Sequence, residues 1–369
     1  MFSLKKNKIT NVQTVVIITN YILAAGILSL PRTSVEAVKT PDAWISVILG
    51  GCGSIILGII MVKLSQRFPK KTFYQYSPEL LGKVFGNLLS CILIVYFLAL
   101  SAFELRVLVE VTSYLILEET PRWAIMMPFL WIGVYLLAGG INSLARMFEI
   151  IFPITVLFFL LTIFMSFKIF EPDNLRPFLG EGILPIIKGV KSTILTFIGA
   201  EIMLLLVAFM EEPKKAVKML IIGVAIPLIF DLITVIMVIG ALSIDGVLHL
   251  TWPTLDLIRS YEIEGLIFER FESFLLVIWT MQIFSTFCIT YFSSTLGLSQ
   301  LFKRESRMFL FILPPIIYVI STIPKTIDKV FMFGDFISKV AIIFFTLIPL
   351  SLLLIAKWKE TSNDHVSSS

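Results

Sequence analysis

Apolar residues occur in long runs along almost the whole chain, and short polar segments separate the runs. A helix needs about 20 apolar residues to cross the core of a bilayer. Most runs reach that length, whereas 88–103 and 309–323 reach it only if flanking polar residues are included. The pattern predicts ten transmembrane helices, at residues 12–37, 43–62, 86–116, 123–141, 147–169, 190–210, 216–242, 270–299, 308–323 and 335–356.

We therefore expect an all-α polytopic membrane protein with a single transmembrane domain over residues 1–357. Residues 358–369 are expected to form a disordered cytoplasmic tail. The composition agrees, because 57% of the residues are hydrophobic and only 15% are charged, against roughly a quarter charged in soluble domains. The start, MFSLKKNKIT, lacks the apolar core and cleavage site of a signal peptide, so the first span is expected to stay in the mature chain.

Lysine and arginine gather on one side of the predicted spans. Cytoplasmic loops carry the excess of these residues, so both termini are expected in the cytoplasm. The net charge of +4 is accounted for by this asymmetry and indicates a lipid bilayer rather than a nucleic acid as partner. The basic residues assigned to the inner side are Lys5, Lys6, Lys8, Lys63, Arg67, Lys70, Lys71, Lys83, Arg146, Lys214, Lys215, Lys218, Lys303, Arg304, Arg307, Lys357 and Lys359.

No group of residues in a polar segment suggests enzymatic chemistry. Cys52, Cys91 and Cys288 are isolated in different predicted spans, where they are expected to be small packing residues rather than metal ligands. The two histidines, His249 and His365, lie far from other ligand types. The chain also lacks a glycine-rich phosphate loop and a Ser-His-Asp set, so we expect no cofactor, no metal and no enzyme.

Ten spans with both ends on one side divide into five plus five, a first repeat at about 12–169 and a second at about 190–356. The second half then has the opposite orientation to the first. Such inverted repeats are typical of secondary transporters, in which the first helix of each half is broken near the bilayer centre. The sequence therefore predicts helix-weakening residues in the middle of spans one and six.

Both spans carry such residues. Span one reads AAGILSLP, where Gly26 tolerates unusual backbone angles and Pro31 gives no N–H to residue 27, so the helix is expected to open around residues 24–28. Span six reads TFIGAEIMLLL, with Gly199 near its centre. Non-helical backbone at this depth is tolerated where it lines a cavity or is buried in protein. The alternative for span one is that it ends at Pro31 and Gly26 packs against a neighbour.

Ionisable residues inside a bilayer are costly and are usually functional or paired. Glu201, beside the second break, is expected to cap a helix end, to hold a bound ammonium or cation, or to be neutral. Asp231 in span seven is expected to pair across helices. In span three, Arg106 and Glu110 are spaced to pair with each other, whereas Glu104 lies on another face, as a gate or as a structural residue.

Two further segments are candidates to line a site. Span eight carries a polar stripe at helical spacing, which faces either another helix or a wet cavity. The stripe consists of Gln282, Thr286, Thr290 and Ser293. The outer loop 245–272 is long and partly amphipathic. It is expected to be either a cap over the site or an ordinary solvated loop.

Several segments together resemble one known family. They are AAGILSLPR, QRFPKKTFYQYSPELLGKVFG, FELR, INSLARMFEIIFP, NLRPFLGEG, FIGAEIML, WPTLDL and FERFESFLLVIW, and their order extends from about residue 8 to 357. The chain resembles the B subunit of bacterial spore germinant receptors, of the amino acid, polyamine and organocation transporter superfamily. The resemblance implies the leucine-transporter fold, the inner membrane of a spore, partner A and C subunits and a small nutrient germinant such as an amino acid.

The resemblance also implies a pocket between helices one, three, six and eight. Its ligand-binding positions here are Ala24, Ala25, Gly26, Leu100, Ser101, Ile198, Gly199, Ala200, Ser285 and Thr286, and its gating or coupling positions are Glu104 and Glu201. This sequence departs from the superfamily at Ala24, where glycine is common. The extra methyl group narrows the space for a ligand carboxylate.

Three functions compete at this point. In the first, the protein is a receptor whose pocket closes on the germinant and signals to partner subunits, since a ligand shifts an equilibrium by its differential affinity for two states. In the second, it is an amino acid transporter driven by H⁺ or Na⁺, with Glu104 or Glu201 in the proton path. In the third, it is an interaction subunit that binds no ligand.

Overall fold

The computed structural model describes residues 8–115, 119–260 and 271–367. These ranges are mostly helical and contain no β-strand, only an isolated bridge between Ile9 and Met210. The α-helices are α1 (Asn11–Ile22), α2 (Gly26–Val38), α3 (Ala43–Gln66), α4 (Phe73–Leu81), α5 (Lys83–Leu115), α6 (Arg122–Ala138), α7 (Gly140–Ser166), α8 (Leu184–Thr196), α9 (Met203–Leu206), α10 (Ala216–His249), α11 (Pro253–Arg259), α12 (Phe271–Phe302), α13 (Ser306–Thr322) and α14 (Ile327–Ser367).

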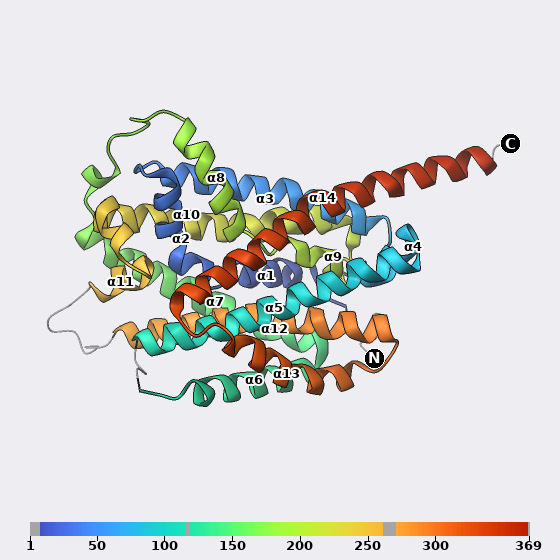
Figure 1. Cartoon of the computed structure of the whole chain (residues 1–369). Coiled ribbons are helices and arrows are strands. Elements are labelled where there is room, and N and C mark those ends of the chain that lie inside the picture. The colour runs from blue at the N-terminus through green and yellow to red at the C-terminus, as the bar shows by residue number, and fades with distance from the viewer. Residues whose placement is uncertain (1–7, 116–118, 261–270, 368–369) are drawn as a thin grey trace.

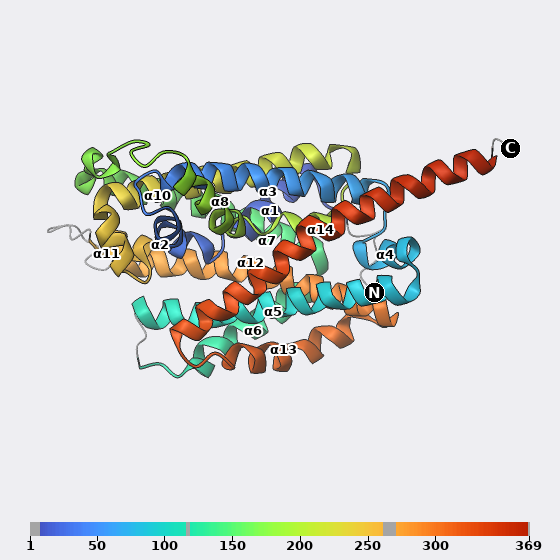
Figure 2. The same ribbon diagram turned by 45° about the horizontal axis from the view of Figure 1, so that its top comes forward.

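The long helices lie side by side in one bundle, which α14 crosses obliquely (Figures 1 and 2). The start of α1, helix α4 and the end of α14 lie at one end of this bundle, and α11 lies at the other (Figure 1). Loops meet at the first end, where the Asn11 side chain donates to Glu212 at 2.7 Å and the Gln66 side chain donates to the Pro213 carbonyl at 2.7 Å. The start of α1 and the end of α14 therefore share one side of the bundle.

Length and composition do not confirm ten separate spans. Among the described helices, five are long and apolar enough to cross a membrane, namely α3, α5, α7, α10 and α14, and the bent pair α1 and α2 makes a sixth. Helices α6 and α13 are apolar but have only 17 residues each. The predicted span six is divided between α8 and the short α9, so neither piece passes alone.

The first predicted break is present, but Pro31 does not cause it. Helix α1 ends at Ile22 and α2 begins at Gly26, with an angle of 56° between them. Pro31 lies inside α2, which continues to Val38. The carbonyl of Ile27, which receives no N–H from Pro31, accepts the Thr254 hydroxyl of α11 at 2.9 Å. The expected opening at 24–28 is corrected to residues 23–25.

The second predicted break lies between α8 and α9. Helix α8 ends at Thr196, and Gly199 has φ +147°, a backbone angle that other residues rarely adopt. A short 3₁₀ turn follows before α9 begins at Met203. The Ser54 hydroxyl of α3 donates to the carbonyl of Phe197 at 2.9 Å, so a neighbouring helix satisfies the exposed backbone.

The ion pair predicted between Arg106 and Glu110 is confirmed, since Arg106 Nη2 lies 2.5 Å from Glu110 Oε1 in α5. A second pair with the same spacing lies in α2, where Arg32 Nε is 2.7 Å from Glu36 Oε1. Asp231 is buried in α10, and its Oδ1 has no hydrogen-bond partner among the described residues, so the expected pair across helices is not seen for that atom.

Two further expectations differ from the structure. Helix α14 continues to Ser367, so most of the segment expected to be a disordered tail is helical. Of the cysteines, Cys288 is buried, whereas Cys52 and Cys91 are exposed on α3 and α5. These two helices present large apolar side chains outward as well, such as Ile56 and Val95, each 62% exposed, which is the surface expected of a protein in lipid.

Helix α3 packs closely on α8 through Gly50. A methyl group at this position would lie 2.5 Å from Thr193 Oγ1 and 2.8 Å from the backbone nitrogen of Ile194. We expect Gly50→Ala to separate the helices and to lower the free energy of unfolding by about 1–3 kcal/mol. Thermal unfolding of the detergent-solubilised protein, followed by tryptophan fluorescence, would measure the loss.

Gly53→Ala is the matched control on the same helix. Its methyl group would meet only the flexible end of the Ile194 side chain, at 2.8 Å. An equal loss of stability in both variants would contradict the close approach of the two backbones at Gly50.

Candidate functional site

A cavity of about 240 Å³ lies where the two broken spans meet α5 and α14. Its lining comes from six parts of the chain, which are both sides of the break between α1 and α2, α5, the end of α8 with the residues that follow, Trp252 before α11, α12 and the first half of α14. Its lining residues are Tyr21, Ile22, Ala24, Ala25, Gly26, Ser29, Thr33, Tyr96, Leu100, Phe103, Glu104, Val107, Ser192, Thr196, Ile198, Trp252, Thr286, Val330, Phe331, Gly334, Asp335, Ile337 and Ser338.

The structure brings most of the sequence-predicted positions to this cavity. The predicted positions that line it are Ala24, Ala25, Gly26, Leu100, Ile198, Thr286 and Glu104. Trp252, which precedes α11, also lines it, and its ring lies 5.4 Å from that of Phe331. Of the outer loop 245–272, Trp252 thus lines the cavity, whereas residues 261–270 lie outside the described residues.

Ser101 and Ser285 do not line the cavity. Each lies one residue from a lining position, which turns its side chain by about 100° around the helix axis. The Ser101 hydroxyl instead contacts Thr290 of α12, with 2.8 Å between the two oxygens, and the Ser285 hydroxyl donates to the carbonyl of Met281 in its own helix at 3.0 Å. Ser101 therefore connects α5 to α12, whereas Ser285 bonds within α12.

Gly199, Ala200 and Glu201 lie beside the cavity rather than on it. Ala200 and Glu201 line a second, mainly apolar cavity of about 240 Å³ between α3, the second break and α14. Gly199 lines neither and acts through its backbone, whose φ of +147° turns the chain at the break.

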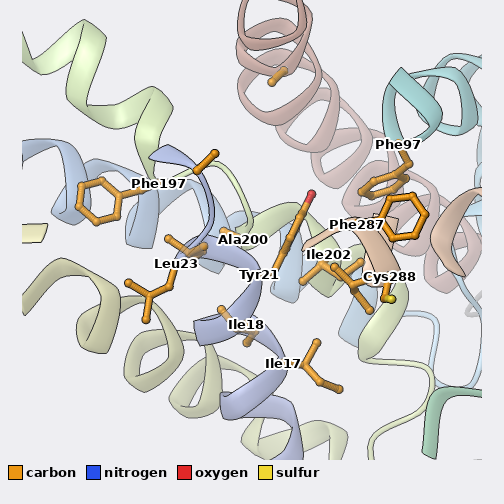
Figure 3. Close-up of a cluster of buried hydrophobic side chains, with 14 of the residues drawn as sticks. Ile17, Ile18, Tyr21, Leu23, Phe97, Phe197, Ala200, Ile202, Phe287 and Cys288 are labelled. Carbon is orange, nitrogen blue, oxygen red and sulfur yellow. The ribbon is translucent and has the colours of Figure 1, made fainter. Parts of the chain in front are cut away.

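Glu201 connects both breaks to α5. Its Oε1 accepts hydrogen bonds from the hydroxyls of Tyr21 at 2.6 Å and Tyr96 at 3.0 Å, and its Oε2 accepts the backbone N–H of Gly199 at 2.6 Å. Figure 3 shows Tyr21 extending from the end of α1, with Leu23, Ala200 and other buried apolar side chains around it. One carboxyl group therefore fixes the last turn of α1, the turn at Gly199 and α5 together.

Sequence reasoning missed Tyr21 and Tyr96, which also line the cavity. Tyr96 lies one helical turn before Leu100, on the face of α5 predicted to reach the pocket. Tyrosine hydroxyls usually find a partner when they are buried. A buried acid in the facing span was the signal that could have identified them.

The ends of α1 and α2 present opposite backbone groups at the break. The carbonyl of Tyr21, near the end of α1, accepts the Thr286 hydroxyl of α12 at 3.0 Å. The first turn of α2 has N–H groups without intrahelical partners and the positive end of the helix dipole, and Ala25 and Gly26 line the cavity there. The start of α2 can therefore hold the negative group of a small ligand.

The polar stripe of α12 faces other helices over most of its length. The Gln282 side chain donates to Asn20 Oδ1 of α1 at 3.1 Å and to the Thr155 hydroxyl of α7. The Thr290 hydroxyl contacts Ser101 of α5. Thr286 is the member of the stripe that also reaches the cavity.

Comparison with known sequences gives one consistent result. A family model described as spore germination protein matches residues 8–330. Spore germination protein YndE of Bacillus subtilis (strain 168) is 54% identical over 98% of this chain and 99% of the relative. Spore germination proteins A2 and B2 of the same organism are 34% and 31% identical, over 96% and 93% of this chain and 96% and 94% of their own lengths.

Solved structures identify the fold. The structure of MhsT in complex with L-phenylalanine matches with a TM-score of 0.68 over 95% of this chain and 98% of that chain, at 12% identity. Mhp1, a nucleobase-cation-symport-1 family transporter in a closed conformation, matches with a TM-score of 0.65 over 94% of this chain and 79% of that chain, also at 12% identity. The chain therefore has the leucine-transporter fold with broken first and sixth spans.

The two glycines at the breaks are expected to differ in their tolerance of a side chain. A methyl group on Gly199 would lie 2.4 Å from Ile22 Cγ1 at a φ that L-residues avoid, so Gly199→Ala should cost about 1–3 kcal/mol of folding free energy. A methyl group on Gly26 would lie 3.0 Å from the Thr196 Cγ2 methyl and 3.9 Å from the Thr196 carbonyl oxygen, so Gly26→Ala should cost less. The stability of each variant is measured as the monodisperse fraction that size-exclusion chromatography recovers after heating at graded temperatures. Equal losses of stability in Gly199→Ala and Gly26→Ala would contradict the backbone constraint at Gly199.

Proposed function

The chain belongs to the spore germination protein family, and from this premise we propose that it is the membrane subunit of a germinant receptor whose central cavity binds a small nutrient, an amino acid. The cavity between the two helix breaks is the observation that supports this proposal. It combines the free N–H groups at the start of α2 with polar side chains such as Thr286 and Tyr96. Pockets of this kind, with a few placed polar groups among apolar walls, bind small molecules.

Binding in this cavity can bias the conformation of the whole subunit. The cavity is lined by both broken spans and by α5 and α14, so a ligand that contacts all of them favours the arrangement in which they lie closest. The Glu201 hydrogen bonds already join both breaks to α5. Closure around a ligand would therefore move these elements together.

The proposed partners and location follow from the family and the charge distribution. The receptor would contain A and C subunits in addition to this chain, in the inner membrane of the spore. The basic residues on one side of the spans support an orientation with both termini in the spore core.

Ion-coupled amino acid uptake is the second candidate. The likeness to MhsT and Mhp1 favours it, because those structures share the fold of this chain. Accumulation of labelled amino acid in proteoliposomes that contain this chain alone, under a proton or sodium gradient, would support a transporter. Saturable binding without accumulation would support the receptor.

A bulky side chain at Leu100 should block the cavity. Leu100 lines it, so Leu100→Trp is expected to weaken the binding of an amino acid at least about tenfold, since ligand and indole would compete for one volume. The assay is equilibrium binding of the proteinogenic amino acids, and of glucose as a neutral nutrient, to the purified full-length protein in nanodiscs.

Val95→Trp is the matched control, because Val95 is 62% exposed on the outer face of the same helix. This variant should bind like the unsubstituted protein. Unchanged affinity in Leu100→Trp, or no binding of any compound by the unsubstituted protein, would contradict a ligand site in this cavity and favour a subunit that binds no nutrient.

A further inference from the structure

We propose that Glu104 binds the positively charged amino group of the ligand, so that the cavity selects compounds with an ammonium group over hydroxy acids and sugars. This inference rests on the proposed ligand site and names the chemistry that the site recognises. The contact would make Glu104 a specificity-determining residue rather than a gate.

Glu104 is a buried acid, and one of its carboxyl oxygens has no partner among the described residues. Its exposed fraction is 3%, and its Oε2 has no hydrogen-bond partner among the described residues, yet the residue lines the cavity. An ionised carboxylate in an apolar environment is costly unless a positive charge or hydrogen bonds compensate it. A cation that enters the cavity is the compensation that the described protein does not supply.

The nearest arginine in the sequence does not compensate it. Arg106 lies two residues further along α5, which turns its side chain about 200° away from that of Glu104. It pairs instead with Glu110, at 2.5 Å. The two acids of this segment thus have different roles, since Glu110 neutralises Arg106 and Glu104 faces the cavity.

The charges around the cavity favour a cation. Its described lining includes the carboxyl groups of Glu104 and Asp335 but no lysine or arginine. Asp335 is on the exposed surface of α14, whereas Glu104 is buried, so a positive ligand meets one acid on the surface and another inside. A cleft that carries acidic groups between apolar walls attracts cations and repels free anions.

An organic ammonium fits this acid better than a metal ion does. Within the described ranges, no group of three or more acidic, histidine or cysteine residues could hold a metal. A divalent cation such as calcium takes six or more oxygen ligands. The carboxylate of Glu104 supplies two oxygens at most. An ammonium group needs one negative partner and a few hydrogen-bond acceptors.

The cavity also provides for the other end of an amino acid. The start of α2 offers N–H groups at Ala25 and Gly26, which suit a carboxylate. The two ends of a zwitterion would then contact different helices, with the carboxylate at α2 and the ammonium at α5. This arrangement requires both charges, so a compound with only one should bind more weakly.

The test compares matched ligands on the full-length protein in nanodiscs. The probes are L-alanine with L-lactate, L-valine with L-2-hydroxyisovalerate, and L-phenylalanine with L-phenyllactate, so that each pair differs only in an amino or hydroxyl group. We expect at least one amino acid to bind about tenfold or more tightly than its hydroxy acid. In Glu104→Gln this ratio should fall close to one, because the amide cannot neutralise an ammonium, while binding of the hydroxy acid changes little.

Asp231→Asn is the matched control, since Asp231 is another buried acid with an unpartnered oxygen but does not line this cavity. It should keep the ratio of the unsubstituted protein. Glu104→Asp retains the negative charge and should keep a preference for the amino acid. If Glu104→Gln is unstable, this variant shows whether the preference depends on the charge or is lost through misfolding.

The outcomes distinguish this inference from the proposed function. A tenfold ratio that survives in Glu104→Gln, or a hydroxy acid or glucose that binds as tightly as the amino acids, would overturn the role of Glu104 and leave the ligand site intact. Absence of binding by every probe would overturn the ligand site and this inference with it.

Discussion

Backbone carbonyl groups that lose their helical partner inside the bundle must find another donor, and this requirement governs the structure. Hydroxyl groups from neighbouring helices supply it repeatedly. Thr254 donates to Ile27 and Thr19 donates to Gly223, the carbonyls that Pro31 and Pro227 leave without an N–H. Each such bond joins two segments that are far apart in the sequence. In an apolar environment an unpartnered backbone group costs several kcal/mol, so these bonds fix where a helix can be irregular.

The same requirement explains how two breaks can exist beside a cavity. At each break a side chain from another helix satisfies part of the exposed backbone, Thr286 at the end of α1 and Ser54 after α8. Glu201 then connects the breaks through Tyr21 and the N–H of Gly199. Ala25 and Gly26 at the start of α2 line the cavity, and in transporters the termini of such broken helices form the binding site.

The sequence predicted the two breaks, because glycine and proline weaken a helix wherever they occur in an apolar run. The seven predicted positions that line the cavity were instead implied by the family resemblance. It misplaced the cause of the first break, since the bond from Thr254 to Ile27 lets α2 continue through Pro31. It also misassigned Ser101, because a one-residue step decides the face of a helix and only packing fixes that rotation. The tyrosine partners of Glu201 depend on contacts between distant spans, and the order of the residues alone does not show which spans meet.

The bond between Thr254 and Ile27 has a mechanical consequence. Helix α2 is also tied to the loop before α11, since the Arg32 side chain donates to the carbonyl of Leu250 at 3.3 Å. A tilt of α2 must therefore carry α11 with it or break both attachments. These two bonds therefore couple the position of a buried half-helix to the surface at that end of the bundle.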